Sequence, residues 1–312
     1  MCQFKRDFRG FYTDQTPPPH AETSATRVSR LVPNPLPAMG APSLSHTEPH
    51  RTVDSLPSPA LVSAMQTPPL RLLVTGKSGR MGQAVIACAS RDPEVTVSAT
   101  HDAGEPLAPT MEAADAIIDF TTQSFTPSVL EAALAANVPL VIGTTGHSEE
   151  FRAILRQAAT RLPIVYAPNF SVGVNTLFWL TRQAVRVLGP SFDLEVVEMH
   201  HRHKIDAPSG TARRLVEILC EETAVSYADD TRHGRFGDVG ARTAREIGVH
   251  ALRGGDVVGD HTVVFAADGE RVELTHKASS RDTFASGAIR AAKWLATQPA
   301  GMYDMQDVLG LR

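Results

Sequence analysis

The chain is poor in the residues that mark several large classes of protein. It has only three cysteines among 312 residues, Cys2, Cys88 and Cys220, and they share no metal-ligand spacing. An odd, unspaced set argues against a disulfide scaffold and is typical of the reduced cytoplasm. No apolar run approaches the ~18 residues that a membrane-spanning helix needs, so we expect no membrane partner.

The chain also lacks a large excess of charge of either sign. The 30 Lys and Arg residues and 34 Asp and Glu residues leave a net charge of −4, and no long basic run occurs. We therefore expect no nucleic-acid partner. The hydrophobic share of 42% and the charged share of 21% are ordinary for a globular protein. At this length the chain has room for two domains, each with its own core.

Residues 1–69 differ in composition from the rest of the chain. They are rich in Pro, Ser, Thr and His and show no sustained hydrophobic period. Such a segment buries too little apolar surface to offset the entropy of ordering, so we predict a disordered Pro-rich extension. It has neither the apolar core of a secretory signal nor the acid-poor composition of a transit peptide. Because Met65 closely precedes the first expected strand, a mis-assigned start at residue 1 remains an alternative.

Strand and helix patterns alternate from Leu70 onward. Short apolar runs predict strands at residues 70–75, 95–100, 116–120, 139–142 and 164–166. A helical pattern follows the first strand to about residue 90, and others cover residues 126–137, with Thr126 as the expected cap, and 148–161. This alternation predicts right-handed βαβ units, and hence an α/β dinucleotide-binding domain with a Rossmann-type parallel sheet over residues 70–171.

The pattern changes after residue 171. We expect a helix at 174–188, a strand at 194–199, a helix at 209–222, strands at 247–252, 261–266 and 271–276, and a last helix at 282–297. The three late strands alternate in the way that antiparallel strands do. We therefore predict a smaller α+β domain over residues 172–254, with residues 255–312 returning to the first domain.

The turn after the first strand has the pattern of a dinucleotide site. It reads Gly76-Lys-Ser-Gly79-Arg-Met-Gly82. Gly76 permits a tight turn, Gly79 lets the backbone approach a pyrophosphate, and Gly82 lets the following helix pack closely against the sheet. Arg80 can add a phosphate contact. The position of these glycines between a strand and a helix predicts a dinucleotide cofactor.

Three further segments lie where a parallel sheet binds such a ligand. Asp102 ends the second strand and can accept hydrogen bonds from the adenosine ribose. Gly143–Thr145 follows the fourth strand, and Ala167–Phe170 follows the fifth. Because the carboxyl ends of parallel strands meet at one edge of the sheet, we expect these segments to line the cofactor site.

The segment from Glu198 to Thr211 concentrates groups that bind anions and transfer protons. Five potentially cationic side chains follow one another as His200-His-Arg-His-Lys204. The segment closes with Ser-Gly-Thr ahead of a helical pattern, and the first N–H groups of a helix can hold a carboxylate or a phosphate. Imidazoles beside such a site are suited to proton transfer. We therefore expect a small anionic substrate and acid–base chemistry.

Together these motifs resemble one enzyme family, dihydrodipicolinate reductase (4-hydroxy-tetrahydrodipicolinate reductase). The resemblance covers about residues 70–310 and leaves residues 1–69 outside. It rests on residues 79–82, 118–121, 141–146, 169–175, 200–211 and 275–280, among which His-His-Arg-His-Lys followed by Ser-Gly-Thr is highly specific. It implies the reduction of 4-hydroxy-tetrahydrodipicolinate to tetrahydrodipicolinate by NADH or NADPH, in the diaminopimelate route to lysine.

The resemblance also implies roles for individual residues. His200 would be the general acid/base and Lys204 the proton donor. A small dicarboxylate would be bound by His201, Ser209, Gly210 and Thr211. The cofactor would be bound by Gly76, Lys77, Ser78, Gly79, Arg80, Met81, Asp102, Gly143, Thr144, Thr145, Ala167, Pro168, Asn169 and Phe170. Arg253 matches a basic position near the hinge between the domains. The second domain would bind substrate and hold together a homotetramer.

Two departures from the family pattern are visible. Ala103 follows Asp102, where relatives that use NADPH often place Arg, and the stretch from Ala103 to Ala116 is shorter than in some relatives. The charge of Asp102 would repel a 2′-phosphate, although Lys77 or Arg80 can offset part of that repulsion. We therefore expect NADH to be accepted at least as well as NADPH.

Two other functions remain as alternatives. One is a nicotinamide-binding regulatory protein that has lost turnover, and the presence of His200, Lys204 and Thr211 together argues against it. The other is a zinc site formed by the clustered histidines. Adjacent histidines on a strand point apart and no Cys completes a set of four ligands, so we expect no metal.

Overall fold

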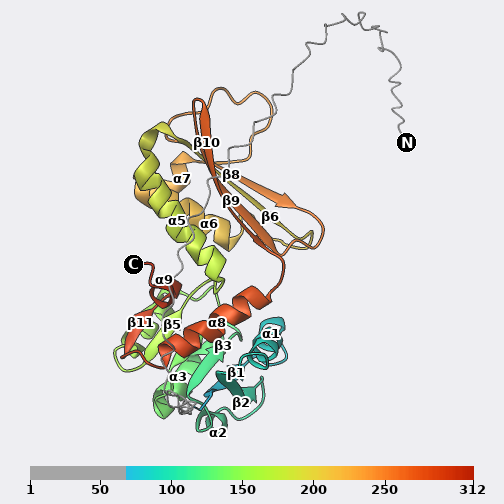
Figure 1. Cartoon of the computed structure of the whole chain (residues 1–312), viewed down its shortest axis with the longest axis vertical. Helices are drawn as coiled ribbons and strands as arrows, with labels where there is room; N and C mark the ends of the chain where they lie inside the picture. The colour runs from blue at the N-terminus through green and yellow to red at the C-terminus, as the bar shows by residue number, and fades with distance from the viewer. Residues whose placement is uncertain (1–67) are drawn as a thin grey trace, which may run out of the picture. The chain divides into compact units, whose positions relative to one another are not determined.

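The structure contains two β-sheets, each with its own helices (Figure 1). It is a computed structural model, and it describes residues 68–312. Residues 1–67 of the predicted Pro-rich extension therefore lie outside the described residues, and so does the alternative start at Met65. Within residues 68–312, no helix is both long and apolar enough to cross a bilayer.

Six parallel strands form the first sheet, in the order β11-β5-β4-β3-β1-β2. They are β1 Leu70–Thr75, β2 Val95–His101, β3 Ala116–Asp119, β4 Leu140–Ile142, β5 Pro163–Tyr166 and β11 Gly301–Tyr303. Every residue of β3 and β4 is buried, as expected for central strands covered on both faces. The predicted Rossmann-type parallel sheet is thus confirmed, and β11 adds an edge strand that the sequence pattern did not indicate.

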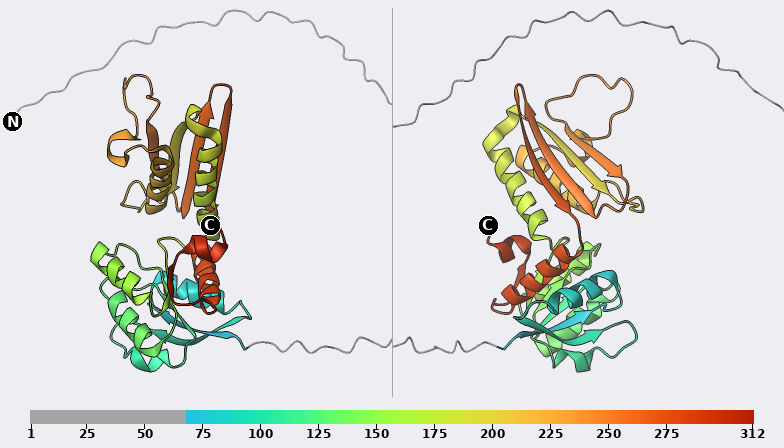
Figure 2. Two further views of the ribbon diagram at one scale, coloured as in Figure 1. Left: turned by 90° about the vertical axis from the view of Figure 1, so that its left-hand side faces the viewer. Right: turned by 45° about the vertical axis from the view of Figure 1, so that its right-hand side comes forward.

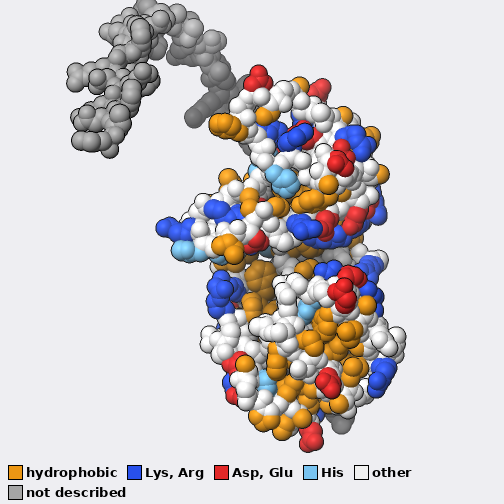
Figure 3. All heavy atoms as spheres, turned by 180° about the vertical axis from the view of Figure 1, so that it is seen from behind, with side chains coloured by type: hydrophobic (Ala, Val, Ile, Leu, Met, Phe, Trp, Pro, Cys, Tyr) orange, Lys and Arg blue, Asp and Glu red, His pale blue; other side chains and the backbone are white. Residues whose placement is uncertain are grey.

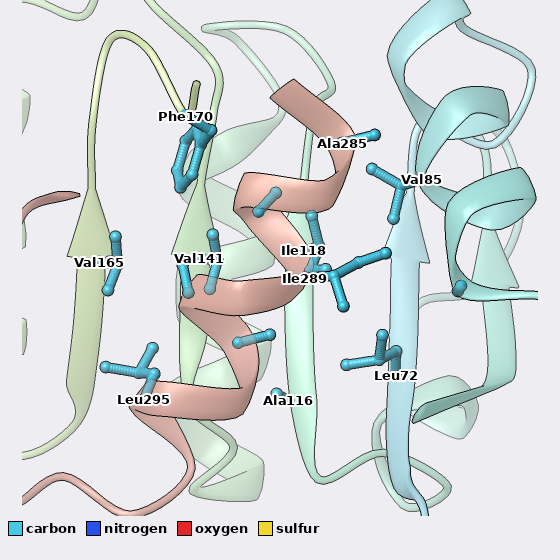
Figure 4. Packing of buried hydrophobic residues seen from close by; sticks show 14 of the residues in the cluster. Leu72, Val85, Ala116, Ile118, Val141, Val165, Phe170, Ala285, Ile289 and Leu295 are labelled. Carbon is cyan, nitrogen blue, oxygen red and sulfur yellow. The ribbon is translucent and has the colours of Figure 1, made fainter. Parts of the chain in front are cut away.

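Helices cover both faces of this sheet. They are α1 Arg80–Ala89, α2 Ala108–Met111, α3 Thr126–Ala136, α4 Glu149–Ala158, α8 Asp282–Leu295 and α9 Met305–Leu309. Successive strand residues point to opposite faces, so Leu72 and Ile118 pack with Ile289 of α8 (Figure 4), whereas Leu73 and Ile117 belong to the core on the other face. Packing on both faces fixes the strands, and with them the edge at which their carboxyl ends meet.

The second sheet is mixed and has the order β10-β9-β6-β8-β7. Its strands are β6 Asp193–His200, β7 Thr231–His233, β8 Ile247–Arg253, β9 Gly259–Ala267 and β10 Glu270–Ala278. The helices α5 Val172–Leu188 and α6 Gly210–Thr223 lie on the same side of this sheet (Figure 2), and the short η1 Gly189–Ser191 and α7 Tyr227–Asp230 complete the region. Side chains of both helices pack with the inward residues of β6, β8 and β9 in one core.

The central strand β6 leads from this core to polar residues. Its inward positions are Leu194, Val196, Glu198 and His200, and all four are buried. The first two are apolar and belong to the core, whereas the last two are titratable. Glu198 and His200 therefore need charged or hydrogen-bonding partners, because an unpaired charge that is buried lowers the stability of the fold.

Three expectations need correction. The second domain was expected to end at residue 254, but β9 and β10 pair with β6, so the second sheet continues to Ala278 and only α8, β11 and α9 return to the first sheet. The strand β8 is parallel to β6 rather than antiparallel. Thr126 is the first residue of α3 rather than its cap, because its hydroxyl bonds to Asp119 and to a backbone carbonyl.

Candidate active site

The turn after β1 is shaped by its glycines. Gly76 has a φ of +80°, in the left-handed region that favours glycine. A Cβ on Gly82 would lie 2.1 Å from the carbonyl oxygen of Gly76, so only glycine lets α1 start this close to the turn. No side chain caps α1 at Gly79, which leaves the N–H groups of its first turn to bind an anion. These features fit the pyrophosphate of a dinucleotide.

The end of β2 and the loop after it bring two carboxylates to the turn. Asp102 accepts a hydrogen bond from the backbone N–H of Ser78 over 3.1 Å. The Nζ of Lys77 lies 2.5 Å from Oε1 of Glu105, whose other oxygen accepts the N–H of Asp102 over 2.8 Å. The ion pair with Lys77 and the bond from Asp102 lower the pKa of the Glu105 carboxyl. Lys77, expected at the cofactor, is therefore already paired with Glu105, an acidic residue for which the sequence predicted no role.

One buried carboxylate fixes the loops at the carboxyl edge of the first sheet. Asp119, at the end of β3, is fully buried and accepts hydrogen bonds from four threonine hydroxyls over 2.7–3.1 Å, those of Thr75, Thr121, Thr126 and Thr144. It thereby ties the ends of β1, β3 and β4 to α3. The pocket beside it is lined by Met81, Phe120, Thr121, Thr122, Gln123, Ser124, Gly143, Thr144 and Thr145. Thr144 uses its hydroxyl to hold the loop, so the expected cofactor contact from this residue falls to the backbone.

The loop after β5 connects the cofactor edge to the segment expected to bind substrate. Asn169 accepts the N–H of Ser171 over 2.8 Å, and its Nδ2 donates to Oγ1 of Thr211 over 3.1 Å. Phe170 is buried and its ring packs edge-on against that of Phe120. Residues far apart in the chain, expected to bind cofactor and substrate, thus meet directly.

His200, at the end of β6, belongs to a buried polar network. Its Nδ1 lies 2.6 Å from Oε2 of Glu198, two residues earlier on the same face of the strand. Arg253 of β8 reaches both oxygens of Glu198, over 2.8 and 2.9 Å, and the backbone N–H of Ser209 donates to Oε1 over 3.0 Å. The Glu198 carboxylate therefore accepts four hydrogen bonds.

The pKa values in this network follow from burial and from these contacts. Burial alone would raise the pKa of the Glu198 carboxyl, but the bonds from Arg253, His200 and Ser209 outweigh it and the pKa is lowered. Burial lowers the pKa of the His200 imidazole. Glu198 opposes that shift, and the charges of Lys204 and Arg253 add to it. Glu198 is thus an anion, and it partly offsets the lowering of the His200 pKa.

The other basic residues of the segment are more exposed than His200. The Nζ of Lys204 is 2.8 Å from Oδ1 of Asp206, and the side chain of Lys204 is 20% exposed. His201 lines a pocket with Arg80, Arg202, His203, Gly255, Asp256 and Arg281. On the face drawn in Figure 3, Lys, Arg and His side chains gather at one edge, while basic and acidic side chains are interspersed elsewhere. A pocket with three arginines and two histidines suits an anionic ligand.

The start of α6 is built as an anion site. The hydroxyl of Ser209 caps the helix by accepting the N–H of Ala212 over 3.2 Å, and it lies 3.1 Å from Nε2 of His261. Ser209 is buried, so its hydroxyl serves the helix and His261. The N–H groups of Gly210 and Thr211 open the helix, where no earlier turn supplies an acceptor. They are the donors available to a carboxylate.

A metal at the histidines finds no support in the described part of the chain. His200 is bonded to Glu198, while the rings of His201 and His203 are 6.3 Å apart between centroids. Among residues 68–312, no group of three or more His, Cys, Asp and Glu side chains is arranged to hold a metal ion.

Several residues at the site have no role that was predicted from the sequence. They are Glu198, His261, Glu105, Asp119 and Arg281. Glu198 carried a local signal, because a residue two positions before His200 on a strand shares its face. His261 and Arg281 lie in later segments and come close only through the pairing of β9 with β6 and the placement of α8.

Comparisons with known proteins agree with this geometry. A family model described as "Dihydrodipicolinate reductase, N-terminus" matches residues 70–170, and one described as "Dihydrodipicolinate reductase, C-terminus" matches residues 173–309. The 4-hydroxy-tetrahydrodipicolinate reductase of Akkermansia muciniphila is 60% identical over 242 residues, which are 78% of this chain and 98% of that protein. The enzyme of the same name from Anaeromyxobacter dehalogenans strain 2CP-1 is 46% identical over 265 residues, again with 78% and 98% covered.

A solved structure shows the same fold. It is the dipicolinate-bound dihydrodipicolinate reductase from Paenisporosarcina sp. TG-14, with a TM-score of 0.62 and 23% sequence identity. The similarity covers 77% of this chain and 98% of that chain. It therefore extends over both sheets.

Proposed function

This chain belongs to the dihydrodipicolinate reductase family, and we propose that it performs the family's reaction with His200 and Lys204 as its proton-transfer groups. It is an oxidoreductase that reduces 4-hydroxy-tetrahydrodipicolinate with a nicotinamide cofactor, in the biosynthesis of diaminopimelate and lysine. Relatives at 45–60% identity carry the reductase name, which favours turnover over a regulatory role.

The observation that carries the proposal is the junction of three groups on β6 and α6. His200 and the N–H of Ser209 share one carboxylate, Glu198, so a proton-transfer imidazole is held beside the anion-binding start of α6. Gly210 and Thr211 would hold a substrate carboxylate there, and Asn169 links Thr211 to the cofactor edge. His201 and the neighbouring basic pocket would attract the second carboxylate.

The residues at the carboxyl edge of the first sheet would hold the cofactor. The turn from Gly76 to Met81 would take the pyrophosphate, Asp102 the adenosine ribose, and the loops Gly143–Thr145 and Ala167–Phe170 the nicotinamide end. When bound, the nicotinamide supplies hydride to the substrate ring. The protein's own contribution is to orient the dicarboxylate and to deliver a proton from His200 or Lys204 to that ring.

Substrate-dependent oxidation of NADH or NADPH, followed at 340 nm with and without a chelator, tests this function. We expect turnover that the chelator leaves unchanged. No turnover with either cofactor would favour the regulatory alternative, and loss of turnover with the chelator would favour a metal site.

We further propose that NADH is used at least as well as NADPH. Asp102 would place a negative charge at the adenosine ribose, Ala103 offers no guanidinium, and Lys77 is paired with Glu105. Two carboxylates close to the ribose disfavour a 2′-phosphate, which carries about two negative charges of its own. Arg80 remains as the counter-charge on this turn.

We also propose a homotetramer in the cytoplasm, assembled through the second sheet. The helices α5 and α6 cover one face of that sheet, while Leu252 of β8 is half exposed on the other and Val197 and Met199 of β6 are partly exposed there. A sheet face that leaves these apolar side chains exposed beside the ion pairs of Glu195 is suited to pairing with other copies. Light scattering during size-exclusion chromatography would give the mass of the assembly.

A further inference from the structure

We infer that Glu198 is a positioning residue that fixes the protonation geometry of His200 and ties it to the substrate-carboxylate site. This inference rests on the proposed role of His200 in proton transfer. Glu198 has a fully buried side chain, and a buried carboxylate persists only where its oxygens are satisfied. Four donors from β6, β8 and the start of α6 converge on it, so this carboxylate joins the three segments.

The contacts of Glu198 decide which nitrogen of His200 carries hydrogen. Arg253 and the N–H of Ser209 can only donate, so the carboxylate is the acceptor for every neighbour. His200 must therefore donate from Nδ1 over its 2.6 Å contact. In the neutral ring the free lone pair is then at Nε2, and proton exchange with substrate passes through Nε2.

The surroundings of the His200 ring leave room for that exchange. A Cβ on Gly259 would lie 3.0 Å from Nε2, so the glycine keeps the tip of the ring uncrowded. The titratable and charged groups around the ring are Glu198 on β6, Arg253 on β8, His261 on β9 and Lys204 on the loop after β6. Glu198 is the one anion among these four, so it is the group that stabilises the imidazolium.

The Glu198 carboxylate also fixes the distance between the His200 ring and the start of α6. Its Oε2 bonds to His200, while its Oε1 bonds to the N–H of Ser209, the cap of α6. A substrate carboxylate bound at Gly210 and Thr211 would therefore lie at a fixed distance from Nε2 of His200. Such fixed orientation is what proton transfer to a specific ring atom needs.

Glu198→Gln tests the inference because it keeps the size of the side chain and removes its charge. Neither Arg253 nor the N–H of Ser209 can accept from the amide NH₂, so the amide should turn its NH₂ to the former Oε2 position, where His200 can accept from it. The ring should then switch to the Nε2–H tautomer, and kcat should fall about 10²-fold or more. Substrate KM and cofactor Kd should change by only a few-fold.

Two readouts separate positioning from a general structural effect. The ¹⁵N shifts of labelled imidazoles should show Nδ1–H in the wild type and Nε2–H in Glu198→Gln. The variant also lacks the group that opposes the lowering of the His200 pKa, so the alkaline limb of the kcat/KM profile should move to lower pH. An unchanged tautomer with an unchanged pH profile would overturn the inference.

A double-mutant cycle with His200→Gln covers the case in which the single variant is unstable. If Glu198 acts through His200, adding Glu198→Gln to His200→Gln should lower kcat no further. Losses that multiply would contradict the inference. If His200→Gln itself keeps normal kcat, the proposed role of His200 fails, whatever the tautomer is.

Glu195→Gln is the matched control. Glu195 lies on the same strand, pointing to the other face, and binds Arg235 and His250 as Glu198 binds Arg253 and His200. Its replacement should lower the melting temperature and leave kcat unchanged in protein of wild-type oligomeric state. Glu198→Asp should recover part of the activity, since it restores the negative charge with a shorter reach.

Discussion

Asn169 donates a hydrogen bond from Nδ2 to Oγ1 of Thr211 over 3.1 Å. Asn169 follows the last strand of the first run of βα units, and Thr211 stands in the first turn of α6, so the bond joins the two sheets' contributions to the site. Because the Thr211 oxygen accepts from Asn169, its own hydrogen is available to a ligand. Thr211 can thus donate to a substrate carboxylate while being held in place from the cofactor side.

Thr211→Val should raise the substrate KM about ten- to a hundredfold. The change is nearly isosteric and removes a charge-assisted hydrogen bond worth roughly 1.5–3 kcal/mol. Steady-state kinetics with the dicarboxylate would measure it. Thr223→Val, near the end of the same helix, is the control, because that hydroxyl bonds only to the helix carbonyl of Leu219. Equal KM values for the two variants would place the carboxylate elsewhere.

His200→Gln should lower kcat by ~10²–10⁴, the usual contribution of a positioned acid or base. Cofactor affinity, measured by fluorescence titration, should stay within about twofold because the turn at Gly76 is untouched. His250→Gln is a suitable control, since His250 also pairs with a glutamate but on the outer face of the second sheet. Near-normal kcat in His200→Gln would remove this residue from the mechanism.

Cofactor choice should respond to residues 103 and 105. Glu105→Gln would release Lys77 and remove one negative charge, so the ratio of kcat/KM for NADPH to that for NADH should rise. Adding Lys77→Met should cancel the gain. Ala103→Arg should raise the same ratio, because a guanidinium matches phosphate geometry.

The control for this series is Glu94→Gln, which breaks a surface pair with Lys293. It should leave the ratio as it is in the wild type. A tenfold preference of the wild-type protein for NADPH would show instead that Arg80 and Lys77 dominate at the ribose.

Stability should fall between pH 7.5 and 5.5 partly because of His261. Burial, together with the charge of neighbouring His200, lowers the pKa of His261 to about 3. An unfolded imidazole takes up its proton near pH 6.5, so the unfolded chain binds more protons than the folded one below that pH. Stability from the neutral ring is complete above pH 6.5 and is lost as the pH falls towards 3.

For His261→Gln, urea unfolding at pH 7.5 and 5.5 should show a loss of stability about 1–2 kcal/mol smaller than that of the wild type over the same interval. His233→Gln, at an exposed position, should behave as the wild type does. Identical pH dependence in wild type and His261→Gln would mean that the buried ring is protonated together with its surroundings.

Local patterns in the sequence determined much of this protein. The apolar runs of β1 to β5, the glycines from Gly76 to Gly82 and the cluster from His200 to Thr211 each act within a few residues, so the parallel sheet, the cofactor turn and the anion-binding helix start could be predicted. The strands β7 and β11 could not, because Thr231–His233 and Gly301–Tyr303 form no apolar run like that of β4.

The tertiary structure decided which distant residues complete the site and where the second sheet ends. The sequences of β9 and β10 show only the alternation of an ordinary strand. Their place in the second sheet follows from the pairing of β9 with β6 and of β10 with β9. The partners of His200 and Lys77 are likewise set by contacts across the fold: Arg253 reaches Glu198 from β8, and Glu105 reaches Lys77 from beyond β2. A charged side chain finds its partner through strand register and loop placement, and these depend on the packing of the whole core rather than on any short stretch of sequence.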